Sequence, residues 1–492
     1  MKYWNKKEDQ NARRIFINLV AFFCGFTFLH SCTKLVQIDP PAQSITTTET
    51  FQDSANSESA IAGIYYSLFS NNSIGAFGSG FLTIYAGCSA DELIPFVGGN
   101  NDQYYYENNL LQAGSTDVVG TPFWNPAYQS IYQANACIDG LQASTGVSAT
   151  VKTELTGEAK FLRAYCYFYL VNLFGDVPYI TSIDFQTTSL AARMPKAQIY
   201  QNIINDLTDA QSSLRSDYSH SGSERVRANK WAATALLARA YLYTGDWTDA
   251  ATQATAVINN ASLYSLDTLN GIFFKNSSEA ILQASVASNL QPLYNIVSEG
   301  FNILPLFPFL GPRYYMSPQL LASFEPGDMR KLAWVDSGTY SGTKYYYPYK
   351  YKLGFSQIVP NTPALQYYMI LRLGEQYLIR AEAEANGANG GTNAALNDLN
   401  TIRTRAGLTN LSNSLTLPET MEAIAHERQI ELFAEWGHRW LDLKRTGQVD
   451  SVMTIVTPQQ NGGGQWQSYQ QLYPIPLGEL TTDPNLKQNP GY

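Results

Sequence analysis

Charged side chains are scarce in this chain of 492 residues. Asp, Glu, Lys and Arg together make up 15% of it, whereas an average soluble domain carries roughly 25%. The 41 acidic residues outnumber the 32 basic ones, which gives a net charge of −9. A nucleic-acid-binding protein needs a concentrated basic surface, so we predict no nucleic-acid partner.

Histidine and cysteine are also rare, with four His and five Cys. So few imidazoles limit metal sites and catalytic triads, and we predict no metal and no cofactor, with a structural calcium left open. Beyond Cys32, the chain has Cys88, Cys137 and Cys166. These three can form one disulfide at most. The helical patterns around Cys137 and Cys166 indicate small buried side chains rather than reactive thiols.

Catalytic motifs are lacking as well. Glu427, Glu431 and Glu435 are spaced four residues apart, but a zinc-protease helix would need His at position 430, which is Ile430. Carboxylates on one helix face do not supply the pair across a cleft, about 5–10 Å apart, that glycoside hydrolysis needs. Phosphate-loop and Gly-x-Ser-x-Gly motifs are absent too. We therefore predict that the protein is not an enzyme.

The N-terminus reads as a processed segment. Basic residues precede an apolar run from Ile15 to Leu29, which is shorter than the roughly 20 residues that span a bilayer. Leu29-His30-Ser31-Cys32 is similar to the cleavage box of bacterial lipoproteins. We predict a lipoprotein signal peptide over 1–31, lipidation of Cys32 and a lipidated tether over 32–50, so that lipid alone anchors the chain. An ordinary signal peptide is the alternative.

Helical periodicity dominates the rest of the chain. It covers about 54–70, 122–143, 152–174, 196–215, 228–260, 370–386, 392–406 and 418–445. The stretch 261–369 is rich in Pro, Gly and Tyr and indicates loops and short strands. The sequence therefore predicts a mostly α fold with an irregular, loop-rich part for ligand binding.

Three helical segments repeat an Arg-Ala core, at Arg163-Ala164, Arg239-Ala240 and Arg380-Ala381. The second copy is followed by Gly245-Asp246-Trp247 and then Ala250. That order is typical of a tetratricopeptide repeat, in which small residues let paired helices approach closely. We predict a tetratricopeptide-like helical base.

Aromatic residues in the irregular segments are the candidate ligand contacts. The flat C–H faces of sugars stack on Tyr and Trp rings, which also offer a polar group. The candidate residues are Asn101, Tyr104, Tyr105, Tyr106, Tyr314, Tyr315, Tyr345, Tyr347 and Trp466. The alternative is that every second Tyr in such a run packs inward as a strand residue.

The most charged segment is predicted to be structural. We expect Glu427, Glu431 and Glu435 to share one helix face. Arginines in the same segment are expected to pair with Glu431, Glu435 and Asp442 and to hold helices together. The predicted ion-pair network is Glu427, Arg428, Glu431, Glu435, Arg439, Asp442 and Arg445.

These segments together resemble the SusD/RagB family of nutrient-binding lipoproteins. The run Glu427–Arg445 is similar to the family pattern E-R-x-x-E-L-x-x-E-G-x-R-x-x-D-L-x-R, with Trp436 ahead of the Gly. The ending, with Tyr473-Pro-Ile-Pro476 and Gln488–Tyr492, and the segment Phe161–Pro178 also match. The resemblance covers most of the chain after the signal peptide.

The resemblance implies an outer-membrane protein that faces the cell exterior. It would bind an oligosaccharide and deliver it to a SusC-like TonB-dependent transporter, over which it acts as a lid. The domain would span 51–492, with an N-terminal part over about 51–225 and a C-terminal part over about 226–492. A peptide-binding protein with the same transport role and a helical-repeat adaptor without a small ligand are the alternatives.

Overall fold

The computed structural model describes residues 47–69, 77–78, 80–96, 102–114, 118–285, 296–307, 309–357, 364–460 and 462–492. The contacts divide the chain into two units, Met1–Thr50 and Phe51–Tyr492. The first unit contains the short helix α2 (Thr47–Thr50). The signal peptide and Cys32 lie outside the described residues.

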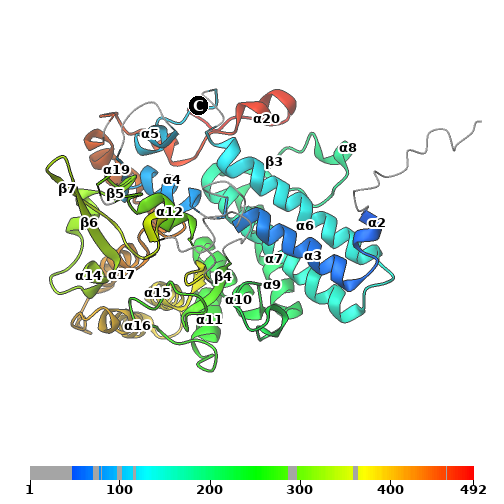
Figure 1. Ribbon diagram of the computed structural model, residues 1–492, viewed down its shortest axis with the longest axis horizontal. Coiled ribbons are helices and arrows are strands. Elements are labelled where there is room, and N and C mark those ends of the chain that lie inside the picture. Colours follow the sequence, from blue (N-terminus) through cyan, green and yellow to red (C-terminus); the bar gives the residue numbers. More distant parts are fainter. Residues whose placement is uncertain are drawn as a thin grey trace, which may run out of the picture. The chain divides into compact units, whose positions relative to one another are not determined.

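Helices make up most of the second unit (Figure 1), which confirms the predicted mostly α class. The longer helices are α3 (Ser54–Phe69), α4 (Phe81–Ser89), α6 (Asn125–Ala143), α7 (Ala149–Phe174), α9 (Lys196–Ser213), α10 (Lys230–Thr244), α11 (Trp247–Ile258), α15 (Leu373–Ala385), α16 (Gly391–Arg405), α17 (Leu417–Leu432), α18 (His438–Arg445) and α19 (Val449–Val456). The short helices are α5 (Asp102–Glu107), α8 (Phe185–Thr188), α12 (Ser298–Ile303), α13 (Pro318–Ala322), α14 (Met329–Trp334) and α20 (Leu477–Thr482).

The helical base is a series of packed neighbours. Helix α7 packs against α6 and α9, α9 against α10, α10 against α11, and α11 against α15, which then contacts α16 and α17. Figure 1 shows α3, α6 and α7 side by side. The predicted helical stretch 228–260 divides at Gly245, whose left-handed backbone ends α10 while the Asp246 side chain caps α11. This is the helix–turn–helix unit that the repeat pattern predicts.

The repeated arginines have one structural role in common. Each donates two hydrogen bonds, through Nε and Nη2, to one carboxylate of another helix. The pairs are Arg163 with Asp206, Arg239 with Glu375 and Arg380 with Asp398, and their Nε–oxygen distances are 2.8, 2.7 and 2.7 Å. The Arg-Ala repeat therefore ties α7 to α9, α10 to α15 and α15 to α16.

The predicted helix over 418–445 is interrupted. Helix α17 ends at Leu432, and Ala434, Trp436 and Gly437 have positive φ angles of 51°, 52° and 66°. A Cβ at Gly437 would come within 2.5 Å of the Ala86 Cβ, so this turn against α4 requires glycine. The prediction that Glu435 shares a helix face with Glu427 and Glu431 is therefore wrong.

The turn places Trp436 in the core. Its ring lies among Phe69, Tyr165, Tyr169 and Tyr368, and its Nε1 donates to the Met369 carbonyl oxygen at 2.6 Å. Because these rings come from three separate segments, α3, α7 and the strand β8 (Tyr368–Arg372), Trp436 joins the N-terminal helices to the C-terminal part.

Short antiparallel strands carry the irregular part of the chain. Strand β1 (Leu93–Pro95) pairs with β5 (Tyr314–Met316), β2 (Val177–Pro178) with β3 (Arg193–Met194), β4 (Ala280–Ala284) with β8 (Tyr368–Arg372), and β6 (Val335–Tyr340) with β7 (Thr343–Pro348). Figure 1 shows β5, β6 and β7 together, away from α9 and α10. The stretch 261–369 also contains α12, α13 and α14, whose five or six residues are too few to show helical periodicity.

The three cysteines of the second unit are free and buried, so the described residues contain no disulfide. Burial raises the pKa of the Cys137 thiol to about 12, which makes it unreactive at neutral pH. The prediction of small buried side chains is confirmed for Cys137 and Cys166. Among the described helices, none has the length and apolar character needed to span a bilayer.

Candidate functional site

The β1–β5 ribbon has one buried and one partly exposed face. In its register Ile94 stands opposite Tyr315, and the Phe96 backbone N–H donates to the Arg313 carbonyl oxygen at 2.8 Å. Leu93, Pro95, Tyr314 and Met316 are buried, whereas Ile94, Phe96, Arg313 and Tyr315 are partly exposed. Alternation along the strands thus turns Phe96, Arg313 and Tyr315 to the same outer face.

Four aromatic rings meet on this face and form what we call the aromatic surface: Phe96, Tyr315, Tyr340 and Tyr345. The Tyr345 ring lies 5.0 Å from Phe96 and 5.1 Å from Tyr315, and Tyr340 lies 5.1 Å from Phe96, all edge to face. Tyr340 is 39% exposed and the other three are partly exposed. These rings come from β1, β5, β6 and β7, and their edge-to-face contacts hold them in place.

A second group of rings, the phenylalanine cluster, consists of Phe301, Phe307, Phe309 and Phe355. Phe307 and Phe309 stack in parallel 5.5 Å apart, and Phe355 meets both Phe301 and Phe307 edge to face. Phe309 is 73% exposed. The Arg313 guanidinium lies 4.9 Å from the Phe301 ring centroid, so Arg313 adjoins both groups of rings.

The structure leaves some of the predicted ligand residues partly exposed and buries others. It brings Tyr315 and Tyr345 together, but Tyr106, Tyr314 and Tyr347 are buried, and their prediction as ligand contacts is corrected. Strand alternation turns Tyr314 inward, as the alternative interpretation expected. Tyr347 lies on the same face of β7 as Tyr345, and it is buried because it packs in a cluster with Ile303 and Leu304. The Tyr106 ring stacks on Tyr85 at 4.4 Å in the core, and its hydroxyl donates to the Val118 carbonyl.

The other candidates lie elsewhere. Tyr104 and Tyr105 are partly exposed on α5 and meet edge to face at 5.9 Å. Trp466 packs edge-on against Trp440, and its Nε1 donates to Asp450 at 2.7 Å. Asn101 lies outside the described residues.

Sequence reasoning did not find Phe96, Tyr340 or the phenylalanine cluster. The available signal was the pattern Leu93-Ile94-Pro95-Phe96, in which a Phe follows a short strand. That pattern has no meaning without its partner strand, which lies more than 200 residues later in the chain.

Each residue of the predicted network forms ion pairs, but several partners differ from the prediction. Arg428 pairs with Asp442 at 2.8 Å and Arg445 with Asp442 at 2.7 Å, whereas Arg439 pairs with Asp91 at 2.7 Å. The three glutamates instead bind cations from outside the segment, which are Arg330, Lys350, Arg372, Arg403 and Arg405.

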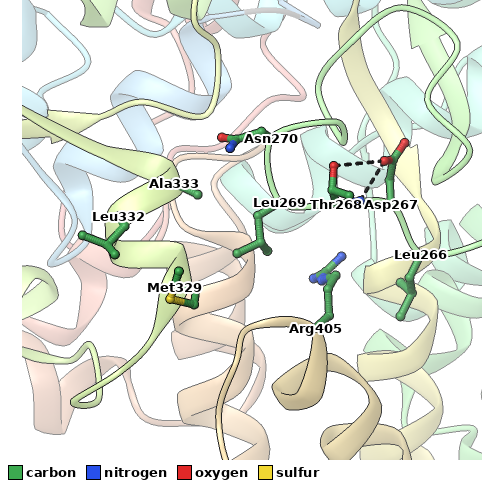
Figure 2. Close-up of a pocket in the computed structure, with 9 residues that line it drawn as sticks. All are labelled: Leu266, Asp267, Thr268, Leu269, Asn270, Met329, Leu332, Ala333 and Arg405. Atoms are coloured by element: carbon green, nitrogen blue, oxygen red, sulfur yellow. Dashed lines mark hydrogen bonds between the residues drawn. The ribbon is translucent and has the colours of Figure 1, made fainter.

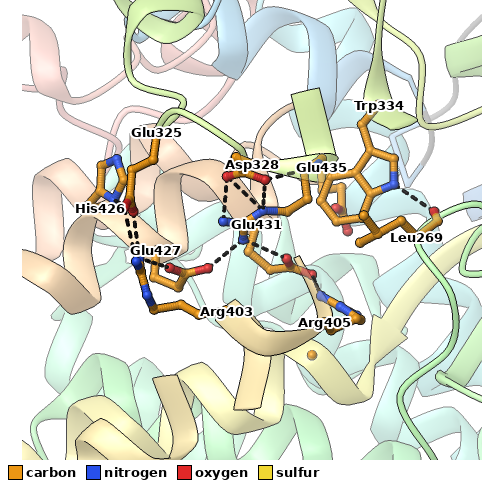
Figure 3. A network of polar contacts seen from close by, with 12 residues as sticks. Leu269, Glu325, Asp328, Trp334, Arg403, Arg405, His426, Glu427, Glu431 and Glu435 are labelled. Carbon is orange, nitrogen blue, oxygen red and sulfur yellow. Dashed lines mark hydrogen bonds and ion pairs between the residues drawn. The ribbon is translucent and has the colours of Figure 1, made fainter. Parts of the chain in front are cut away.

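Glu431 lies at the centre of this network (Figure 3). Its carboxylate contacts Arg372 at 2.7 Å, Arg330 at 3.1 Å and also Arg405. Burial alone would raise the pKa of Glu431, but the surrounding guanidinium groups hold it well below its usual range. A carboxylate so fully engaged holds elements together and is a poor proton acceptor.

One group among the described residues has the side chains for a metal. Ligand atoms of Glu325, His426 and Glu427 all lie within 4.8 Å of one another. The Arg403 Nη1, however, lies 2.5 Å from Glu325 and 3.4 Å from Glu427, and Arg330 also pairs with Glu427 (Figure 3). These guanidinium groups already supply the positive charge, so the donor set fits an ion-pair network better than a metal ion.

Two hollows among the described residues have linings that include none of the rings of the aromatic surface. One, of about 570 Å³, is shown in Figure 2, with Met329 and Leu332 on one side and Leu266 and Arg405 on the other. The Arg405 guanidinium is already bound to Glu279 and Glu431, which leaves mainly apolar contacts. The second hollow, of about 610 Å³, includes Trp124, Tyr128, Phe185 and Glu479 in its lining.

Comparisons with known proteins identify what the chain is similar to. The family model described as "SusD family" matches residues 329–492, and the one described as "Starch-binding associating with outer membrane" matches residues 35–242. SusD-like protein P25 of Formosa agariphila is 26% identical over 96% of this chain and 98% of that protein.

Solved structures share the fold. A SusD superfamily protein from Bacteroides thetaiotaomicron superposes with a TM-score of 0.75 at 23% identity, over 89% of this chain and all of that one. A laminarin-binding SusD-like protein gives a TM-score of 0.71 at 23% identity, over 90% of this chain and all of that one.

Proposed function

The chain belongs to the SusD/RagB family, and from this we propose that it captures an oligosaccharide at the aromatic surface and delivers it to a SusC-like TonB-dependent transporter. SusD-like proteins are binding proteins rather than enzymes, and the family is one of carbohydrate binders. We further propose that acyl chains on Cys32 anchor it to the outer membrane, facing the cell exterior.

The aromatic surface is the observation that carries the proposal. Sugar rings present flat C–H faces that pack on aromatic side chains, and the tyrosine hydroxyls can bond to sugar hydroxyls. Phe96, Tyr315, Tyr340 and Tyr345 are partly exposed yet braced against one another. Such a surface loses little conformational freedom when a ligand binds.

The arrangement of the charged residues supports a binding protein rather than an enzyme. The carboxylates of the Glu431 network are surrounded by arginines, and the network ties α14, β8, α16 and α17 together. Its place between packed elements fits the structural role that the sequence predicts.

The test is calorimetric titration of the mature chain, prepared from Thr33 so that it has no lipid anchor. Laminarin oligosaccharides, other plant and fungal glycans and a mixture of peptides are the ligands. We expect saturable binding of one glycan class that Tyr345→Ala abolishes. The matched control is Tyr346→Ala, because Tyr346 points to the opposite face of β7 and stacks with Lys344.

Three results would change the proposal. Binding of peptides alone would favour the peptide-binding alternative. If Tyr346→Ala were as damaging as Tyr345→Ala, the site would lie elsewhere. If no ligand bound to the folded protein, the helical-repeat adaptor would be favoured.

A further inference from the structure

Arg313 adjoins both the aromatic surface and the phenylalanine cluster. Across the β1–β5 ribbon it stands opposite Phe96, on the face that also carries Tyr315. On its other side the guanidinium lies 4.9 Å from the centroid of Phe301 in the phenylalanine cluster. A cation therefore lies at the junction of two partly exposed groups of aromatic rings.

Within the part of the chain that the structure describes, most of the hydrogen-bonding capacity of this guanidinium is unused. Its Nη1 donates to the Asn302 Oδ1 at 3.2 Å, and no carboxylate of the described residues lies within ion-pair distance of it. By contrast, Arg163, Arg239 and Arg380 each bind a carboxylate through two hydrogen bonds. Arg313 is partly exposed, so a ligand can reach the donors that remain.

We propose that Arg313 makes the aromatic surface selective for glycans that carry an oxyanion, either the carboxylate of a uronic acid or a sulfate ester. The inference rests on the proposed glycan-binding function and names its substrate class. A planar guanidinium binds either group through two parallel hydrogen bonds. The rings on both sides contact the sugar faces and limit the water that would screen the charge.

Arg313 is a local positive charge on a protein whose net charge is negative. With a net charge of −9, the protein as a whole repels an anionic polymer, so attraction must come from particular residues. Lys344 is a second cation, next to Tyr345 in the chain, but it is exposed on the opposite face of β7 and stacks on Tyr346 at 4.9 Å. It therefore provides a matched control for charge alone.

The experiment titrates the mature chain, without its lipid, with three sets of oligosaccharides by calorimetry. Neutral laminarin oligosaccharides, oligogalacturonides and sulfated galactan oligosaccharides separate the carboxylate from the sulfate. We expect one anionic set to bind about tenfold or more tightly than the neutral set, which is the scale of one charge-assisted contact. The preference should weaken as the salt concentration rises.

Arg313→Gln should abolish the preference for the anionic set and its salt dependence. Arg313→Lys should keep part of this preference, and Lys344→Gln should keep all of it. Equal or tighter binding of the neutral set, or an equal loss in Lys344→Gln, would overturn the inference and leave the proposed function standing. If none of the three sets bound to the folded protein but another glycan did, the inference would be overturned and the proposed function would stand; if no glycan bound, both would be overturned. Thermal melts of each variant establish that it folds.

Discussion

The Phe96 ring lies directly against the backbone of Gly311. A Cβ at position 311 would come within 2.4 Å of the Phe96 Cζ and within 2.7 Å of two further ring atoms. No such contact is tolerated between real atoms, so the position of Phe96 requires glycine there. Gly311 therefore helps to fix the aromatic surface, although it contributes no side chain of its own.

Gly311→Ala should weaken glycan binding severalfold or more, because the added methyl group must displace the Phe96 ring from Tyr340 and Tyr345. Calorimetric titration with the glycan that binds the unaltered protein measures the loss. The melting temperature should change little, because Phe96 and Gly311 are partly exposed.

The control is Gly63→Ala on α3, where a Cβ would meet nothing within 4 Å. It should leave binding unchanged and stabilise the helix by about 0.5–1 kcal/mol. Unchanged glycan binding by Gly311→Ala would mean that Phe96 does not contact the ligand.

The buried pair Arg239–Glu375 should contribute strongly to stability. Glu375→Gln leaves the Arg239 charge uncompensated between α10 and α15, at an expected cost of about 3–5 kcal/mol at pH 7. The exposed pair Lys160–Asp209 is the control, and Asp209→Asn should cost less than about 1 kcal/mol. Urea unfolding of both variants gives the comparison, and equal costs would contradict the assigned role.

The Glu375 contribution should also disappear in acid. Burial raises the pKa of this carboxyl, but the Arg239 guanidinium outweighs burial and lowers the pKa to about 2, below the value of about 4.3 in an unfolded chain. The stabilisation is therefore present above pH 4.3 and is lost as the pH falls toward 2. The difference in unfolding free energy between the unaltered protein and Glu375→Gln should shrink over that range. A constant difference would mean that folding does not lower the pKa of Glu375.

Glu92 should make stability depend on pH in the opposite direction. Its side chain is 1% exposed, it forms no ion pair with the described residues, and burial raises its pKa to about 8. Because this pKa lies above the value of about 4.3 in an unfolded chain, the stability that Glu92 contributes is fully present below pH 4.3 and is lost progressively as the pH rises to about 8. Glu92→Gln should therefore remove about 2–3 kcal/mol of the loss in stability between pH 6 and pH 9.

Urea unfolding at intervals between pH 6 and pH 9 measures the Glu92 effect. Glu375→Gln serves as the control, because the Glu375 carboxyl that it removes is ionised throughout this range. If Glu92→Gln and the unaltered protein lost stability in parallel, Glu92 would not be the titrating group.

The long helices could be predicted because their signals are local. For α7 the periodicity indicates 152–174 and the structure gives Ala149–Phe174. The three additional residues follow Ser148, whose hydroxyl caps the helix by accepting from the Val151 N–H. The role of the Arg-Ala repeat in joining helices was not predicted, because the partners Asp206, Glu375 and Asp398 show no common spacing from their arginines.

The aromatic surface could be predicted only in part, because it depends on pairing between distant segments. Tyr345 and Tyr347 lie two residues apart and share one face of β7, so strand alternation does not separate the buried ring from the partly exposed one. Packing against different segments separates them: Tyr347 is buried in a cluster with Ile303 and Leu304, whereas Tyr345 contacts Phe96, about 250 residues away. The hydrogen bond from the Trp466 Nε1 to Asp450 could not be predicted either, because no local pattern pairs the two residues.

Membrane attachment should depend on Cys32. Replacement Cys32→Ala removes the thiol to which acyl chains would be joined, so incorporation of labelled palmitate into the protein should be abolished. Without the acyl chains that we propose as its anchor, we expect the variant to leave the membrane fraction, whereas Cys88→Ala, which alters a buried thiol, should not. Palmitate on the Cys32→Ala variant would place the acyl chain on another residue. A variant that stayed in the membrane fraction without palmitate would mean that the segment Ile15–Leu29 is retained as an uncleaved anchor or that the transporter alone holds the protein. Fractionation in cells that lack the transporter separates these two cases.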